Sequence, residues 1–113
     1  MTRNKYNAKK VTTEEGTFDS QAEYRRWCEL KLLEKAGEIR DLRRQTKFPL
    51  EFNGVKFGFY KDDFDYRPAN DVTITVEDLK GVKTAIYRLK KKLMKAVHGI
   101  DILETPAGKR RAA

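Results

Sequence analysis

A buried apolar stripe that ends in charged side chains is the first sign of chemistry in this chain. Residues 72–80 read VTITVEDLK, and in a strand the apolar side chains at 72, 74 and 76 share one face. Asp78 and Lys80 continue that face. Buried charges are costly unless they are paired or hold a metal. A carboxylate and an ammonium in this place therefore indicate a functional site.

The preceding segment repeats the pattern. Residues 55–66 read as one strand, whose apolar positions 55, 57 and 59 share a face that continues to Asp63 and Asp65. If the chain turns back around residues 70 and 71, Asp63 lies directly opposite Asp78. Like charges opposite each other in an antiparallel pair are destabilising, so this pair needs a compensating cation.

Two such carboxylates suit a hard divalent cation such as Mg²⁺, which takes carboxylate oxygens and keeps several waters. The ion would offset charge on a phosphodiester and activate a water, and Lys80 could orient that water or stabilise the phosphorane-like state. A D-x-K triplet taken alone is a weak signal. The alternative to a metal site is an ordinary surface hairpin in which Asp63 pairs with Lys80. Matching acids at the ends of two neighbouring apolar stripes favour the metal site.

Glu23 is a third candidate carboxylate. The run SQAE at residues 20–23 has the form of a capping box, in which Glu23 bonds back to the backbone of Ser20. Trp27 and Leu30 follow Glu23 at i+4 and i+7, which places Glu23 on the side of the helix that should face the sheet. Capping and metal-site roles carry equal weight here and are compatible.

The elements around these residues predict an α/β fold. We expect a small mixed, largely antiparallel central sheet flanked by helices, in a single domain over residues 1–104 with a basic arm at 1–7, followed by a basic disordered tail at 105–113. Gly37 ends the first helix and an Asn53-Gly54 pair makes a hairpin turn. The remaining expected elements are a hairpin at 8–18, a helix at 83–97 with the stripe Ile86, Leu89, Leu93 and Val97, and a last strand at 100–104.

The composition indicates which kinds of partner the protein binds. The 113 residues carry a net charge of +8, which favours a polyanion, most often nucleic acid, over a merely solvated basic surface. The single cysteine, Cys28, excludes an intrachain disulfide and a multi-cysteine zinc site. No apolar run is long enough to span a membrane, so we expect a soluble cytoplasmic protein. The candidate DNA-contacting residues are Lys9, Lys10, Arg43, Arg44, Lys83, Lys90, Lys91 and Lys95.

The order of these motifs resembles the PD-(D/E)XK nuclease superfamily. Within it, the chain looks like small phage-encoded endonucleases of the Holliday junction resolvase type, related to phage endonuclease I. The likeness spans roughly residues 5–104 and is carried by YNAKK at 6–10, FDSQAE at 18–23, DDFDY at 62–66, VEDLKG at 76–81 and YRLKKK at 87–92.

The resemblance implies a restriction-endonuclease-like core, Mg²⁺ or Mn²⁺ as the cofactor, and Glu23, Asp63, Asp78 and Lys80 as catalytic residues. The three carboxylates among them would be the metal ligands. Asp62 stands where the superfamily has a proline, and Asp65 could replace Asp63 as the ligand.

The expected function is a divalent-metal-dependent endodeoxyribonuclease that hydrolyses branched DNA such as a Holliday junction. We expect a homodimer, because a junction needs two cuts, and the host cytoplasm as its location if the chain is phage-encoded. One alternative is a nuclease of the same superfamily that acts on nicked, linear or transposon-end DNA. The other is a non-catalytic basic DNA-binding accessory protein.

Overall fold

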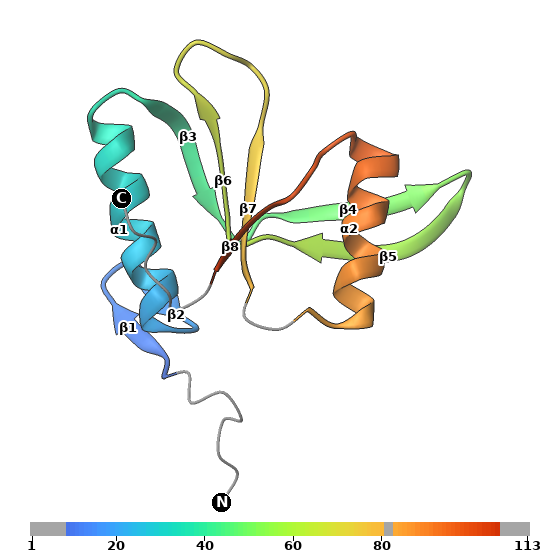
Figure 1. The fold of residues 1–113 in the computed structure, drawn as a ribbon, viewed down its shortest axis with the longest axis horizontal. Helices are drawn as coiled ribbons and strands as arrows, with labels where there is room; N and C mark the ends of the chain where they lie inside the picture. The colour runs from blue at the N-terminus through green and yellow to red at the C-terminus, as the bar shows by residue number, and fades with distance from the viewer. Residues whose placement is uncertain (1–8, 81–82, 107–113) are drawn as a thin grey trace, which may run out of the picture.

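One four-stranded sheet organises the chain (Figure 1). The computed structural model describes residues 9–80 and 83–106. The expected arm at 1–7 and nearly all of the expected tail lie outside the described residues. The elements in chain order are β1 (Val11–Thr13), β2 (Gly16–Phe18), α1 (Gln21–Lys35), β3 (Ile39–Arg44), β4 (Lys47–Phe52), β5 (Val55–Lys61), β6 (Phe64–Pro68), β7 (Thr75–Lys80), α2 (Ala85–His98) and β8 (Leu103–Pro106).

The main sheet is mixed and largely antiparallel. Its strand order is β3-β6-β7-β8, in which β6 runs antiparallel to both neighbours and β8 runs parallel to β7. Two further two-stranded sheets, β1-β2 and β4-β5, stand apart from it. With α1 and α2 on either side of the main sheet in Figure 1, the expected α/β class is confirmed.

The start and end of α1 follow local sequence signals. The hydroxyl of Ser20 accepts a hydrogen bond from the backbone N–H of Glu23 at 3.1 Å, and Gly37 follows the last turn with φ +83°. The capping box differs in one detail from the prediction. The Glu23 carboxylate accepts its bond from the N–H of Asp19, at 3.0 Å, one residue before the expected donor.

The register between β6 and β7 is the expected one. Phe64 pairs with Glu77 and Tyr66 pairs with Thr75. One step beyond these pairs, Asp63 lies opposite Asp78, and the Asp63 N–H donates to the carbonyl of Glu77 at 3.2 Å. Asp63, directly before β6, and Asp78, near the end of β7, therefore lie at the same height on neighbouring strands.

The segment 55–66 is not one strand, which corrects the prediction. It divides at Asp62 and Asp63: β5 pairs with β4, whereas β6 enters the main sheet between β3 and β7. Backbone and side-chain bonds between Thr46 and Asp62 hold the point where the chain changes partner. As a result, Val55, Phe57 and Phe59 lie on an exposed ribbon and not in the core.

The buried face of α2 also differs from the prediction. Tyr87 and Met94 are its buried residues, while Ile86 and Leu89 of the expected apolar stripe are exposed. Met94 packs in one core with Leu50 of β4, and Leu93 of the expected stripe packs against the same core. The buried side of α2 therefore overlaps the predicted stripe at Leu93 but is centred on Tyr87 and Met94.

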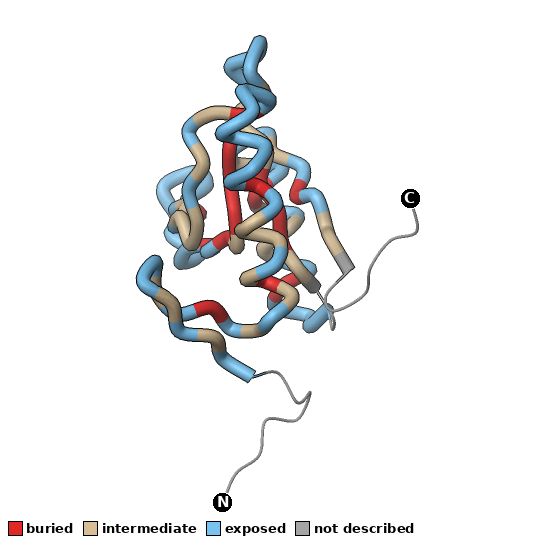
Figure 2. The backbone as a smooth tube through the Cα atoms, turned by 90° about the vertical axis from the view of Figure 1, so that its left-hand side faces the viewer, coloured by how far each residue is buried: buried red, intermediate tan, exposed pale blue. Residues whose placement is uncertain are grey.

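The main sheet is covered on both faces. On one face Phe64 and Tyr66 pack with Leu30 of α1. On the other face Val76 packs with residues of the β4-β5 ribbon and of α2, among them Tyr60. Figure 2 shows the buried backbone in the interior of the molecule, surrounded by exposed backbone. None of the helices in the described ranges is long and apolar enough to cross a membrane.

Candidate active site

Asp63 and Asp78 form the centre of the candidate site, each held by a donor from a neighbouring element. The Asp63 carboxylate accepts the backbone N–H of Leu79 at 2.6 Å. The Asp78 carboxylate, which is buried, accepts the hydroxyl of Tyr60 from β5. Both carboxylates are therefore oriented before any ligand binds, as a preorganised site requires.

Two tyrosines line the Asp78 side of the site. Burial and the hydrogen bond to Asp78 raise the pKa of Tyr60. Burial and the hydrogen bond to Glu104 raise the pKa of Tyr87, and the negative charge of Asp78 raises it further. Both phenols stay protonated at neutral pH. Tyr87 donates to Glu104 at 2.8 Å, and Glu104 is the β8 residue that pairs with Asp78.

Glu104 gathers two of the predicted DNA-contacting lysines. Lys83 lies 2.9 Å and Lys91 2.8 Å from its carboxylate oxygens. Hydrogen bonds from Lys91, Lys83 and Tyr87 lower the pKa of Glu104 to about 2. The carboxylate thus remains charged and holds two ammonium groups one strand away from Asp78.

Glu23 lies at the same end of the molecule. In Figure 1 the first turn of α1, the start of β6 and the end of β7 all lie at the lower end of the sheet. Glu23 is buried, and its Oε2 has no hydrogen-bond partner. Burial raises the pKa of this carboxyl. A buried carboxyl with an unsatisfied oxygen is costly in a purely structural role.

The structure brings two of the three expected metal ligands, Asp63 and Asp78, to neighbouring positions. Within residues 9–80 and 83–106, no three His, Cys, Asp or Glu side chains lie close enough together to hold a metal ion. Lys80 ends β7 opposite Pro106 of β8. The side chain of Lys80 lies outside the described part of the chain.

Two neighbouring acids, Asp65 and Glu77, are bound by arginines instead of joining the site. Asp65 is fully buried and receives two bonds from the guanidinium of Arg43, at 2.8 Å each, which makes Asp63 the better ligand of the two. Glu77 points to the other face, as expected, where Arg26 binds it through two nitrogens at 2.9 and 2.7 Å. These two acids are ion-paired and serve the fold.

Asp62 is a residue that the sequence reasoning did not assign. It is buried beside Asp63, and its Oδ1 accepts the N–H of Thr46 at 2.8 Å. Burial and the neighbouring Asp65 raise the pKa of Asp62 to about 9. The carboxyl is thus protonated at neutral pH. The signal in the sequence was the run of three aspartates within residues 62–65, but spacing alone does not show which of them is neutral.

Several other predicted DNA-contacting residues lie against acids or rings of the chain itself. Arg44 packs its guanidinium 4.0 Å from the ring centroid of Phe18 and donates to the Thr17 carbonyl, so its role is at least partly structural. Lys9 is exposed. The other partners are Asp19 for Lys10, Asp65 for Arg43, Asp101 for Lys95 and the ring of Phe59 for Lys90.

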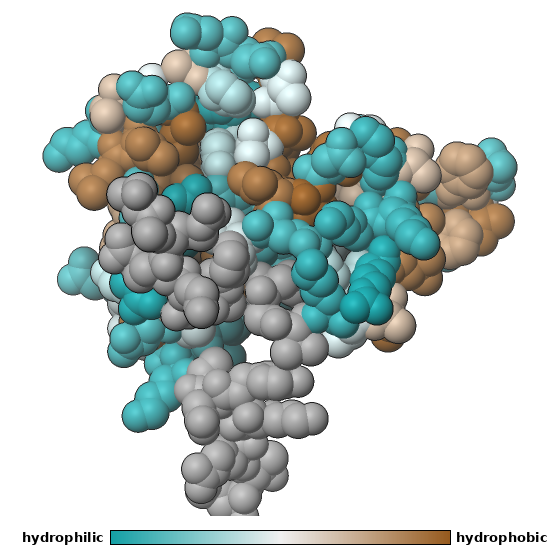
Figure 3. Space-filling model, viewed as in Figure 1, coloured by the Kyte–Doolittle hydropathy of each residue, from teal (hydrophilic) through white to brown (hydrophobic). Residues whose placement is uncertain are grey.

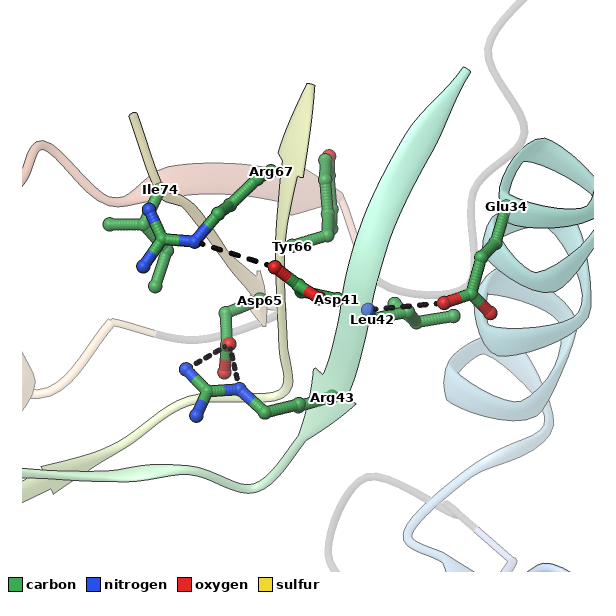
Figure 4. A pocket seen from close by; sticks show the side chains of 8 residues that line it. All are labelled: Glu34, Asp41, Leu42, Arg43, Asp65, Tyr66, Arg67 and Ile74. Carbon is green, nitrogen blue, oxygen red and sulfur yellow. Dashed lines mark hydrogen bonds and ion pairs between the residues drawn. The ribbon is translucent and has the colours of Figure 1, made fainter. Parts of the chain in front are cut away.

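A pocket of about 420 Å³ lies elsewhere on the sheet (Figure 4). Its lining includes the Arg43–Asp65 pair and Arg67, whose Nε lies 3.8 Å from Asp41. Neither Asp63 nor Asp78 lines it. Because its arginines face acids of the same pocket, it offers an anion little unshared positive charge, and we assign it no function.

Comparison with known proteins places the chain in a family. Residues 3–102 match the model of a family described as a protein of unknown function, DUF1064. The chain belongs to this family. The match includes Glu23, Asp63, Asp78 and Lys80, so all four predicted catalytic residues lie within the matched range. No curated protein and no solved structure matches the chain. The family description names no activity, and a function has to be argued from the site.

Proposed function

We propose that the protein is a divalent-metal-dependent endodeoxyribonuclease that acts on branched DNA such as four-way junctions. The observation that carries this proposal is the cross-strand pair of Asp63 and Asp78, with Lys80 two residues further along β7. The motifs follow the order of the PD-(D/E)XK pattern: a helix with Glu23, a strand start with Asp63, a strand with the D-x-K triplet, a helix and a strand. The three strands of this series, β6, β7 and β8, are neighbours in one sheet.

The residues present fit a magnesium or manganese ion. Mg²⁺ is commonly bound through one or two protein carboxylates, with waters and substrate phosphate oxygens completing its shell. Asp63 and Asp78 would be those two carboxylates. Glu23 does not lie with them as a third ligand in the described residues, so waters and phosphate oxygens would complete the shell. When bound, the metal offsets the charge of the scissile phosphate and lowers the pKa of a water.

The chain's own groups have separate tasks in this proposal. The Leu79 N–H and the Tyr60 hydroxyl fix the orientation of the two aspartates. From the motif, Lys80 orients the attacking water or stabilises the negative charge of the transition state. Lys83 and Lys91, held at Glu104, place positive charge beside the site for the DNA backbone.

The DNA substrate and the assembly follow from the charge of the chain and from the resemblance. The net charge of +8 supports a polyanion, and the preference for junctions rests on the resemblance to resolvases. A homodimer would supply the two active sites that a junction with two scissile strands needs.

The test compares a labelled four-way junction with a duplex of equal length, with Mg²⁺, with Mn²⁺ and with chelator. Asp78→Asn and Lys80→Ala should lower junction cleavage by roughly 100-fold or more, the scale for removal of a catalytic group. Tyr60→Phe should lower it by roughly 10- to 100-fold, because the ring remains but the bond to Asp78 is lost. Glu14→Gln, an exposed acid in the turn between β1 and β2, is the matched control and should cleave normally.

Each other outcome selects a different function. Equal cleavage of junction and duplex would keep the nuclease but replace its substrate with nicked, linear or transposon-end DNA. Tight, salt-sensitive binding without cleavage by any variant would favour the accessory DNA-binding protein. Thermal melts of each variant separate loss of activity from loss of the fold.

A further inference from the structure

The β4-β5 ribbon carries aromatic rings on its surface that the fold does not use. Phe52 and Phe57 are each 48% exposed and Phe59 is 45% exposed, in a sheet of only two strands. Figure 1 shows the ribbon reaching away from the main sheet, past α2, and Figure 3 shows hydrophobic surface over this end of the molecule. Exposed apolar groups gathered on one element mark an interaction surface.

Lysines border these rings. The ammonium of Lys47 lies 5.0 Å from the ring centroid of Phe59, and that of Lys90, from α2, lies 5.6 Å from the same centroid. Lys61 is the cross-strand partner of Lys47, which doubles the positive charge at this end of the ribbon. Like charges directly opposite each other cost stability, and a polyanionic ligand would offset that cost.

The ribbon is also physically joined to the candidate active site. Tyr60, next to Phe59 in β5, turns inward and donates its hydroxyl to Asp78. Leu50 of β4 is buried in the same core as Val76 of β7. A ligand on the exposed rings of β5 would therefore lie on the strand that orients a metal-site carboxylate.

We propose that the β4-β5 ribbon is a stacking platform for unpaired DNA bases. Proteins that bind single strands combine aromatic rings, on which bases stack, with cations that follow the phosphates. Phe57 and Phe59 would supply the rings, and Lys47, Lys61 and Lys90 the cations. The proposal rests on the proposed function for the identity of the polymer, and it narrows the substrate class to branched DNA that exposes unpaired bases near the branch point.

Charge distinguishes this occupant from a second copy of the chain. A symmetric contact through the ribbon would place its lysines against the same lysines of the other copy. Glu51, opposite Lys56, is the acid that β4 and β5 contribute between residues 47 and 61. DNA, in contrast, brings phosphates to the lysines and π faces to the rings.

The test measures binding of a labelled single-stranded oligothymidine in chelator, so that no cleavage is needed. Phe57→Leu with Phe59→Leu keeps apolar surface but removes both rings, and should weaken binding about 10-fold or more. Phe57→Trp with Phe59→Trp should retain or strengthen it. Leu32→Ala, an exposed apolar residue on α1, is the control and should bind normally. Photo-crosslinking of iodouracil-containing DNA should label residues 55–61 of the wild-type chain.

Three results would overturn the platform. The first is unchanged binding by the double leucine variant, and the second is crosslinks that fall only in other segments. The third is a dimer that dissociates in the Phe57→Ala with Phe59→Ala variant while the affinity for DNA stays the same. The last would make the ribbon an interface between copies. The platform and the nuclease can fail separately. Weak single-strand binding in the leucine variant together with no metal-dependent cleavage by wild type would support the platform and reject the nuclease.

Discussion

At the scale of single residues, the site depends on which of several neighbouring acids is charged. Asp63 and Asp78 are oriented by a backbone N–H and a tyrosine hydroxyl, while Asp65 is held by Arg43. Asp62 differs from all of these. It is buried with one oxygen unsatisfied, and its raised pKa keeps it neutral beside the candidate metal ligands.

The substitution Asp62→Asn tests this difference. The pKa of Asp62 rises from 3.8 to about 9 on folding, so the folded state keeps a proton that the unfolded chain releases. Wild-type stability should therefore fall as pH rises across the window from about 4 to about 9. Asparagine can still accept from the Thr46 N–H and cannot ionise. The variant should exceed wild type by several kcal/mol at about pH 8, and match it near pH 4.

Urea unfolding of both proteins across this pH range measures the effect. Asp101→Asn, at an exposed position, serves as the control and should follow the wild-type profile. A stability difference between Asp62→Asn and wild type that does not change with pH would mean that Asp62 is ionised in the folded protein.

At the scale of elements, α2 is attached to the main sheet by polar contacts as well as by its core residues. Tyr87, Lys83 and Lys91 all bind Glu104, the residue of β8 that lies beside Asp78. The attachment sets where the lysine-rich side of the helix lies relative to the candidate site. It also explains why Tyr87, and not Ile86, faces inward.

Glu104→Gln should loosen this attachment. The folded-state pKa of Glu104 is lowered from 4.5 to about 2, so its contribution is present above about pH 4.5 and is lost as pH falls toward 2. Because both lysines are about half exposed, solvent screening limits the loss to roughly 1 kcal/mol at neutral pH. Chemical unfolding at several pH values would show this as a difference that shrinks in acid. A difference that persists near pH 2 would point to packing instead of charge.

At the scale of the whole molecule, fewer lysines and arginines are available to DNA than their total of 25 suggests. Several of the lysines and arginines that the sequence nominated for DNA contact are engaged with acids of the chain, as Lys10 is with Asp19 and Lys95 with Asp101. The β4-β5 ribbon is different, because Lys47 and Lys90 lie over an aromatic ring. Affinity for DNA should therefore depend unequally on lysines of similar exposure.

The salt dependence of DNA binding measures this inequality. Each phosphate contact adds about one to the slope of log affinity against log salt. Lys47→Gln and Lys90→Gln should each lower the slope by about one, whereas Lys95→Gln should change it less, because Lys95 is paired with Asp101. Equal effects of all three would indicate that the net charge acts as a whole and that the ribbon has no special part.

The sequence predicted the fold class, the ends of the first helix and the partnership of Asp63 with Asp78, while the second helix begins at Ala85 and not at the expected residue 83. It did not predict the division of residues 55–66 or the neutral state of Asp62. It grouped Phe57 and Phe59 with a buried stripe, although they lie on the surface of the ribbon. The activity, the metal and the DNA partner stay predictions until the cleavage and binding measurements are made.

The features that the sequence determined depend on local backbone geometry. Ser20 caps a helix, Gly37 ends it with a positive φ, and the alternation of side chains along two strands decides which aspartates share a face. Only the tertiary structure decided which strand β5 pairs with, which side of α2 is buried and which acids meet arginines. Those outcomes depend on the burial and charge of elements distant in the chain, and the same local pattern is compatible with several of them.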